Sequence, residues 1–224
     1  MTLKTMALKS SALGKLLPLA AVSLAIGLAQ PASAAVLYDN GPINGTLSAW
    51  TINFGYAVSD SFTLSSTSTI TGVNFGVWSF PGDTLNTVDW AITSTPNSYP
   101  VDGTAAVTNG ATSTNGFGYN LSMDSFSTGA VTLGPGTYYL VLQNAAVSTG
   151  DPIYWDINNG PSTAYENTIG DVNGSLFPGT NSDAFQILGT TGGVPEPATW
   201  AMSIVGFGML GSVLRRRKVA AVAA

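Results

Sequence analysis

The sequence predicts an all-β fold for residues 35–191, an antiparallel β-sandwich of jelly-roll-like type. Short segments in this stretch alternate apolar and polar residues, which is the period of a half-buried strand. Glycine, asparagine and proline turn signals separate these segments, and threonine and serine occupy the polar faces. No window in the stretch keeps a helical period. Together these patterns favour a sandwich of short antiparallel strands.

The expected strands follow one another with short turns between them. The most strand-like segment is 137–143, in which Tyr138, Leu140 and Leu142 share one face. A turn at residues 134–136, Gly-Pro-Gly, precedes it. In chain order the expected strands are 35–38, 50–54, 58–64, 69–78, 88–93, 105–108, 117–123, 131–133, 137–143, 153–157 and 184–188. Residues 158–178 are expected to be mostly loop.

The N-terminal segment has the three parts of a secretory signal peptide. Three lysines come first, an apolar run over residues 16–29 follows, and small residues end the segment at Ala32-Ser33-Ala34. We expect a signal peptide over residues 1–34, cut by signal peptidase before Ala35. A retained signal anchor is the alternative.

The C-terminal segment also has three parts in a fixed order. Pro195-Glu196-Pro197 comes first and holds the neighbouring backbone extended, where a processing enzyme can reach it. The uncharged run 198–214 follows; as a helix it is roughly 26 Å long, against a hydrocarbon core of about 30 Å. The basic block 215–218 should stay on the cytoplasmic side. We therefore expect a transmembrane helix over 198–214, a basic stop, and a short cytoplasmic tail over 219–224.

These C-terminal residues resemble the PEP-CTERM sorting signal of Gram-negative bacteria, in the version reading PEP-x-x-W-A-M, then G-F-G, then an arginine cluster. The expected signal spans residues 192–218, and its motif residues are Pro195, Glu196, Pro197, Trp200, Arg215, Arg216 and Arg217. The resemblance covers only about the last thirty residues. It implies that an exosortase-like enzyme cuts near the Pro-Glu-Pro and moves the protein to the cell surface or extracellular matrix. A plain C-terminal membrane anchor is the alternative.

The charge distribution excludes several classes of function. All seven Lys and Arg residues lie in the two end segments, and residues 35–214 contain no Lys, Arg, His or Cys. Eleven acidic residues lie between Asp39 and Asp183, so the sandwich domain has no internal side-chain salt bridge and cannot neutralise nucleic-acid phosphates. It also lacks an imidazole base, a thiolate or lysine nucleophile, and the usual zinc or copper ligands. Carboxylate chemistry and hard-cation binding remain.

Four carboxylates fall in one loop-rich region, at Asp151, Asp156, Glu166 and Asp171. Asp171-Val172-Asn173-Gly174 matches part of a calcium loop, but the later ligands at EF-hand spacing are missing. Solvated turn carboxylates are the favoured interpretation. A calcium site at these four residues and a glycosidase carboxylate pair stay open. We predict no catalytic residue, no firm metal site and no cofactor other than this open calcium site.

The aromatic residues have two interpretations. Most should belong to the core, because large aromatic side chains dominate the burial in a sandwich. Those that are exposed could instead stack on sugar rings. The residues concerned are Trp50, Trp78, Trp90, Tyr99, Tyr119, Tyr154 and Trp155.

Three further segments resemble the exported sandwich domains that often precede this sorting signal. They read D-S-F-T-L at residues 60–64, G-T-Y-Y-L-V-L at 136–142 and D-A-F-Q-I-L at 183–188. Such domains are mostly uncharacterised, so this resemblance implies a sandwich and brings no catalytic residues.

The sequence as a whole predicts an exported, surface-sorted, non-enzymatic protein of the cell envelope or extracellular polysaccharide matrix. Its expected partners are signal peptidase, an exosortase-like enzyme, the membrane before processing, and an extracellular polysaccharide. A carbohydrate-binding module and a carboxylate-only glycoside hydrolase are the alternatives. An exposed aromatic strip would favour the first, and two carboxyl groups about 5–9.5 Å apart across a cleft would favour the second.

Overall fold

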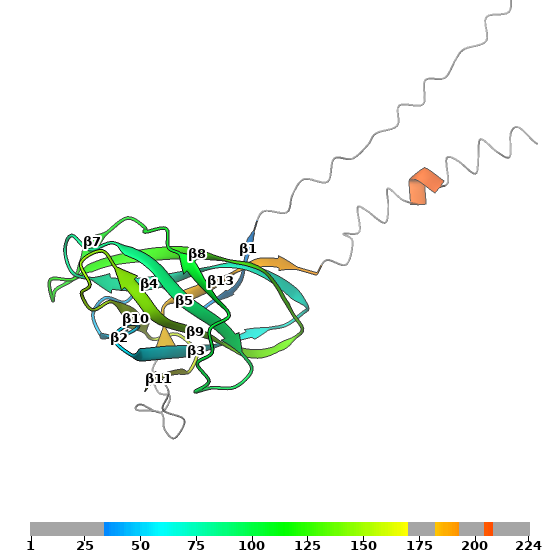
Figure 1. The fold of residues 1–224 in the computed structure, drawn as a ribbon. Helices are drawn as coiled ribbons and strands as arrows, with labels where there is room; N and C mark the ends of the chain where they lie inside the picture. The colour runs from blue at the N-terminus through cyan, green and yellow to red at the C-terminus, as the bar shows by residue number, and fades with distance from the viewer. Residues whose placement is uncertain (1–33, 170–181, 193–203, 208–224) are drawn as a thin grey trace, which may run out of the picture. The chain divides into compact units, whose positions relative to one another are not determined.

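The computed structural model describes residues 34–169, 182–192 and 204–207 of the 224-residue chain. By its internal contacts the chain divides into residues 1–31, which lie outside the described residues, and residues 32–224. The described part of the second unit contains two antiparallel β-sheets, one of eight strands and one of five. Figure 1 shows these sheets stacked as two layers. The predicted all-β sandwich is therefore confirmed.

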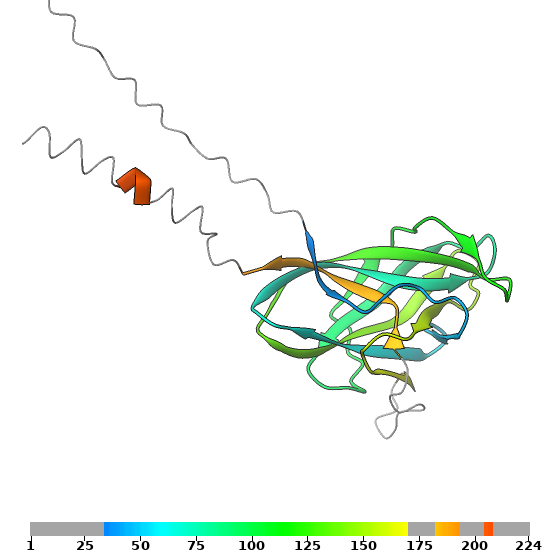
Figure 2. The same cartoon turned by 180° about the vertical axis from the view of Figure 1, so that it is seen from behind.

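The larger sheet is built around a long central strand, β4, which pairs with β8 along its whole length and with β13 and β10 on its other edge. Strands β1 and β13 lie side by side at one edge, as Figure 2 shows. The strands of this sheet are β1 (Ala35–Asp39), β2 (Ser48–Thr51), β4 (Ser68–Ser79), β7 (Ser113–Thr114), β8 (Asn120–Leu133), β10 (Tyr154–Asn158), β12 (Ser182–Asp183) and β13 (Phe185–Thr191).

The smaller sheet has the order β11-β3-β9-β5-β6. Its strands are β3 (Tyr56–Leu64), β5 (Leu85–Thr93), β6 (Gly103–Ala106), β9 (Gly136–Val147) and β11 (Ala164–Thr168). The chain passes between the two sheets several times, for example from β3 to β4 and from β8 to β9. The predicted Gly-Pro-Gly turn is thus a sheet-to-sheet crossing, because the strands that it joins lie in opposite layers.

The hydrophobic core lies between the sheets. Alternate residues of β3 and β9, such as Phe62 and Leu140, are buried and face the larger sheet. From the larger sheet, the buried side chains of Trp155 and Phe185 pack into the same core. Their rings lie edge to face, with centroids 5.5 Å apart. Each such fully buried side chain stabilises the fold by about 1.5–3 kcal/mol. This core is what the period-2 pattern predicts.

Two details of the predicted strand order are wrong. Residues 158–178 include β11, which was not predicted as a strand because its Glu166 and Asn167 have low strand propensity. Residues 117–123 and 131–133 are not separate strands, because β8 runs unbroken over residues 120–133. Its middle is rich in Ser, Thr and Gly, which hid the alternation, and residues 117–119 belong to the turn before it.

The predicted targeting segments lie mostly outside the described residues. Of the cleavage-site residues only Ala34 and Ala35 are described, and Ala35 opens β1. The sorting-motif residues Pro195 to Trp200 and Arg215 to Arg217 are not among the described residues. Only residues 204–207 of the predicted transmembrane helix are described, and they are helical. Within the described ranges no helix is long and apolar enough to cross a membrane.

Candidate functional site

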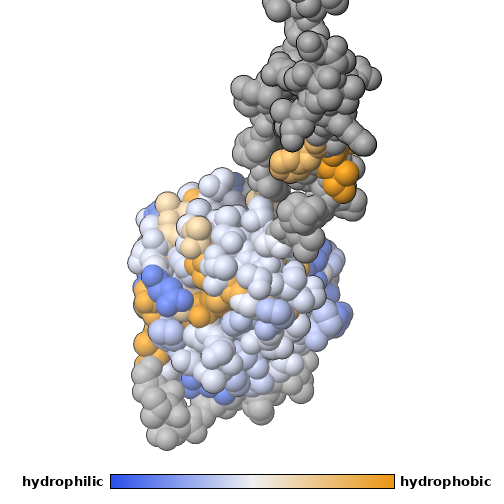
Figure 3. Space-filling view, turned by 90° about the vertical axis from the view of Figure 1, so that its right-hand side faces the viewer, coloured by the Kyte–Doolittle hydropathy of each residue, from blue (hydrophilic) through white to orange (hydrophobic). Residues whose placement is uncertain are grey.

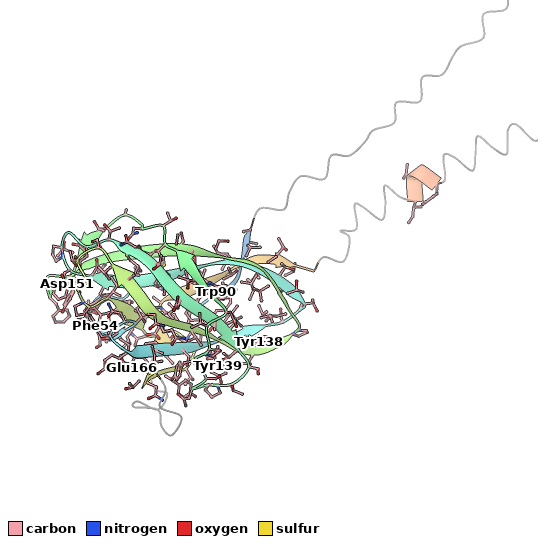
Figure 4. All side chains as sticks on the ribbon, in the orientation of Figure 1. Phe54, Trp90, Tyr138, Tyr139, Asp151 and Glu166 are labelled. Atoms are coloured by element: carbon pink, nitrogen blue, oxygen red, sulfur yellow. The ribbon has the colours of Figure 1, made fainter. Side chains whose placement is uncertain are left out.

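The structure separates the four carboxylates that the sequence grouped together. Asp151 is exposed and accepts a hydrogen bond from the Thr149 hydroxyl at 3.0 Å, whereas Asp156 and Glu166 are buried on β10 and β11. Figure 4 shows Asp151 and Glu166 at separate places on the sandwich. Asp171 lies outside the described residues. In the described part of the chain no group of three or more His, Cys, Asp or Glu residues is placed to hold a metal ion.

Asp156 is held by three protein donors. The backbone amides of Asn44 and Gly45 donate to its two oxygens at 2.7 and 2.8 Å, and the Trp78 indole Nε1 donates at 2.5 Å. Burial raises the pKa of Asp156, and these hydrogen bonds partly offset the rise. Its side chain lies on the same face of β10 as Tyr154, beneath the segment 42–45.

Trp78 connects Asp156 to an aromatic cluster on this outer face, which consists of Trp78, Phe80, Phe117, Tyr119 and Tyr154. Phe117 is 63% exposed and stacks on Trp78 with ring centroids 5.9 Å apart. The ring of Tyr119 packs against those of Trp78, Phe80 and Tyr154, with centroids 5.0 to 5.7 Å apart. A cavity of about 190 Å³ lies beside the cluster, lined by Ser48, Ala49, Trp78, Tyr119 and Tyr154.

A tight turn between β7 and β8 positions the exposed ring of this cluster. The Asn115 side-chain oxygen accepts hydrogen bonds from the amides of Phe117 and Tyr119, both at 3.0 Å. Gly118 in this turn has φ +86°, which favours glycine. Phe117 is thereby held over Trp78 by its own backbone.

The other aromatic residues do not join the cluster. Trp50, Trp90 and Trp155 are buried in the core, as the first interpretation predicted. Tyr99 is half-buried and donates to Asn97 at 3.0 Å. Of the seven aromatic residues considered in the sequence, only Trp78, Tyr119 and Tyr154 therefore belong to one surface site.

A second group of polar residues, which we call the interior acidic cluster, lies between the sheets and was not predicted. It consists of Asn40, Asp60, Ser162, Ser182 and Asp183. Asp60 and Asp183 have no exposed surface, although they belong to opposite sheets. Asp60 alternates with Val58, Phe62 and Leu64 along β3, and this alternation was a signal for a core-facing carboxylate.

The two interior carboxyl groups have strongly shifted pKa values. Burial raises the pKa of Asp60 to about 7, against hydrogen bonds from Ser162 and the Asp183 amide. Burial also raises the pKa of Asp183 well above its usual range, and the negative charges of Asp60, Asp156 and Glu166 add to the rise in that order. Both interior carboxyl groups therefore keep their protons to a higher pH than an exposed aspartate does.

A cavity of about 480 Å³ adjoins the interior acidic cluster. Two chain segments line it, residues 39–44 and residues 158–161. Asn40 belongs to both the cavity lining and the cluster. The cluster is thus buried but lies one side chain away from the cavity.

Comparison with known protein families assigns the C-terminal segment. Residues 193–218 match the family model of the PEP-CTERM protein-sorting motif. The chain carries a PEP-CTERM sorting signal. The match leaves the sandwich unassigned, and no curated protein matches the chain.

The PEP-CTERM motif begins where the sandwich ends. The last strand stops at Thr191, and the Gly192 amide donates to Thr67 at 2.7 Å. The motif starts at the next residue. The chain is therefore a β-sandwich followed directly by a sorting motif, and this motif implies exosortase-dependent sorting to the cell surface and an exosortase-like processing partner.

Proposed function

We propose that this PEP-CTERM protein is an exported, non-enzymatic component of the cell envelope or the extracellular polysaccharide matrix. The observation that carries the proposal is the sorting motif at residues 193–218, joined directly to the last strand of the sandwich. In this proposal the motif directs sorting, and the β-sandwich is the domain that is exported.

The residues available for chemistry support a non-enzymatic role. The sequence between residues 35 and 214 has no His, Cys or Lys, so a hydrolase would need a carboxylate pair. Asp60 and Asp183, the two interior carboxylates, have no exposed surface, and a glycosidic bond cannot reach them. Asp156 is committed to three structural hydrogen bonds.

Processing at both ends tests the sorting proposal. We expect the protein recovered from the cell surface or medium to begin at Ala35 and to lack the basic block 215–218. Intact-mass spectrometry of fractionated cells measures both ends at once. The matched control replaces Pro195-Glu196-Pro197 with alanines, which should leave the basic block attached. Surface-exposed wild-type protein that keeps this block would support a plain anchor instead.

The aromatic cluster favours a second candidate function, carbohydrate binding. Phe117 presents an exposed ring face beside a cavity of about 190 Å³ whose lining includes Tyr119 and Tyr154. Sugar sites commonly combine a ring to stack on with a few polar groups that fix orientation. The hydroxyl groups of the two tyrosines supply such groups here. A polysaccharide ligand would retain the sorted protein within the matrix.

Affinity electrophoresis in gels containing extracellular polysaccharide tests this candidate. We expect the wild-type protein to be retarded and the Phe117→Ala variant to migrate about as it does in gels without polysaccharide. Phe54→Ala is the matched control, because Phe54 is equally exposed, at 64%, and has no ring contact with the cluster among the described residues. Equal retardation of the wild type and both variants would exclude the aromatic cluster as the binding site.

A further inference from the structure

The interior acidic cluster brings two carboxylates from opposite sheets into the core. Asp60 lies on β3 in the series of alternate residues that includes Val58 and Phe62, which are buried. Asp183 on β12 pairs with Ile157 on β10, and paired residues point to the same face. Ile157 belongs to the core, so Asp183 also faces inward.

Three oxygens of this pair are buried and unpaired. Asp60 Oδ1 and both carboxylate oxygens of Asp183 have no hydrogen-bond partner among the described residues. By contrast, Asp60 Oδ2 accepts from the Asp183 amide at 2.7 Å and from the Ser162 hydroxyl at 2.8 Å. A buried polar group without a partner is costly, and a buried charge without one is far more so. Another group is therefore needed to compensate Asp183.

The sandwich sequence has no side-chain cation to supply that compensation. Residues 35–214 contain no Lys, Arg or His. The groups whose charges raise the pKa of Asp183 are Asp60, Asp156 and Glu166, and all three are carboxyl groups. Glu166 lies on the same inward face as Asp60, since it pairs with Val58 on the neighbouring strand. Only a bound cation or protons can neutralise the pair.

The side chain of Asn40 shows that the cluster is rich in oxygen. Four oxygens surround its amide nitrogen: Ser162 Oγ at 2.5 Å, Ser182 Oγ and Asp183 O at 2.7 Å, and Asp60 Oδ2 at 3.2 Å. An amide nitrogen carries only two hydrogens, so at least two of these four oxygens must share a hydrogen or receive none from it. Neutral oxygen donors thus lie beside the unpaired carboxylates.

We propose that Asp60 and Asp183 bind one calcium ion between the two sheets. Calcium takes carboxylate, hydroxyl and backbone oxygens in flexible geometry, and this cluster contains oxygens of all three types. The absence of His and Cys from the domain disfavours zinc and copper. Asn40 lies between the cavity of about 480 Å³ and the pair, and this cavity gives the ion a route from the surface.

Thermal unfolding of the full-length protein in detergent, after chelation of divalent ions, tests the site. We expect calcium at 100 times its dissociation constant to raise the Tm by about 5–10 °C, because it binds only the folded state. Sodium chloride at matched ionic strength should produce a much smaller rise. Equal effects of the two salts would overturn the proposal.

Two variants and a matched control locate the ion. Asp60→Asn and Asp183→Asn should each abolish the calcium-specific rise in Tm. Asp151→Asn should retain it, because Asp151 is exposed and belongs to the earlier candidate set. A calcium-specific rise that survived in both Asp60→Asn and Asp183→Asn would overturn the assignment.

A direct measurement on the wild-type chain covers the case in which the variants fail to fold. The Trp155 indole donates to the Ala184 carbonyl at 2.9 Å, next to Asp183 in the chain. Terbium bound at the pair should therefore emit when tryptophan is excited, saturate at one ion per chain and be displaced by calcium. Absence of this calcium-displaceable emission would overturn the proposal whatever the variants do.

Discussion

Asp156 and Asp183 are both fully buried carboxylates of the larger sheet, yet their surroundings are opposite. Asp156 faces outward, where the segment 42–45 covers it and three donors reach its oxygens. Asp183 faces inward, and neither of its oxygens has a hydrogen-bond partner among the described residues. Burial alone therefore does not determine whether a carboxylate is compensated. The hydrogen-bond donors on its side of the sheet determine that.

The supply of donors differs for a physical reason. On the outer face a covering loop has backbone amides that no strand ladder uses, so Asn44 and Gly45 can point them at Asp156. Between the sheets the donors are unevenly shared: the Asp183 amide and the Ser162 hydroxyl donate to Asp60 Oδ2, whereas no donor among the described residues reaches the Asp183 carboxylate. An inward carboxylate must then find a side-chain partner, a proton or an ion.

The largest expected effect is the pH dependence of stability in the presence of a chelator. The pKa of Asp60 is raised from an unfolded value near 3.9 to about 7, so the folded state binds more protons. The stabilising contribution is complete below about pH 4 and is lost as the pH rises through 7. We expect the free energy of unfolding to fall by on the order of 4 kcal/mol over this range, measured by urea titration.

Other groups near the interior pair act in the same direction. The pKa values of Asp156, Glu166 and Asp183 are also raised, in each case mainly by burial. Saturating calcium should flatten the pH profile, because the ion replaces the protons. Asp183→Asn should reduce the slope without calcium. A free energy of unfolding that increased from pH 4 to pH 7 in chelator would contradict this account.

A smaller effect is expected on the outer face. Asp156→Ala removes the acceptor of three hydrogen bonds and leaves buried donors on Asn44, Gly45 and Trp78. We expect a loss of about 3 kcal/mol in the free energy of unfolding, since each orphaned donor costs about 1–3 kcal/mol and some regain water. Urea unfolding at pH 7 measures it.

Two comparisons make this second test specific. Asp151→Asn alters an exposed carboxylate and should change stability by no more than about 0.5 kcal/mol. Asp156→Ala should also keep the calcium-specific rise in Tm, because its side chain lies on the opposite face of the sheet from Asp183. Loss of the calcium-specific rise in Tm in Asp156→Ala would contradict the assignment of the calcium site to the inner face alone.

The period-2 pattern predicted most of this fold because the core requires it. Segments such as 69–78 and 137–143 alternate in the sequence and form long central strands. The pattern failed where strands bury polar residues, as in β11, or carry Ser, Thr and Gly in their middle, as in β8. Which sheet a strand joins was also not predictable, because Gly134-Pro135 signals a turn without specifying its partner strands.

The interior pair was missed because the carboxylates were grouped by sequence proximity. Asp60 and Asp183 are 123 residues apart, and only the stacking of the two sheets brings them together. Yet both are in phase with alternating apolar residues, with Phe62 and Leu64 after one and Phe185 and Ile187 after the other. A carboxylate in phase with core residues was the available signal, whereas the loop-rich position of Asp151 indicated only solvent exposure.

The smallest expected effect is a difference in calcium response between two glycine variants. Gly160 lies beside the interior acidic cluster, and Gly76 lies beside Asp156 on the outer face. A Cβ on Gly160 would contact the Asn40 carbonyl oxygen and lie 2.5 Å from Ser182 Oγ, so a Gly160→Ala change must displace the interior acidic cluster. A Cβ on Gly76 would instead lie on the outer face, 2.8 Å from an Ile43 carbon, 2.9 Å from the Ala184 Cβ and 3.1 Å from the Asp156 Cβ. Each substitution overpacks a close contact and should cost about 1–3 kcal/mol in urea unfolding.

The two glycine variants should therefore match in stability but differ in their response to calcium. Gly160→Ala should weaken the calcium-specific rise in Tm, because Asn40 and Ser182 supply oxygens beside Asp60 and Asp183. Gly76→Ala should leave that rise intact, since its new methyl group points away from the interior pair. Equal weakening in both variants would mean that the calcium response follows general stability and does not depend on the oxygens between the sheets.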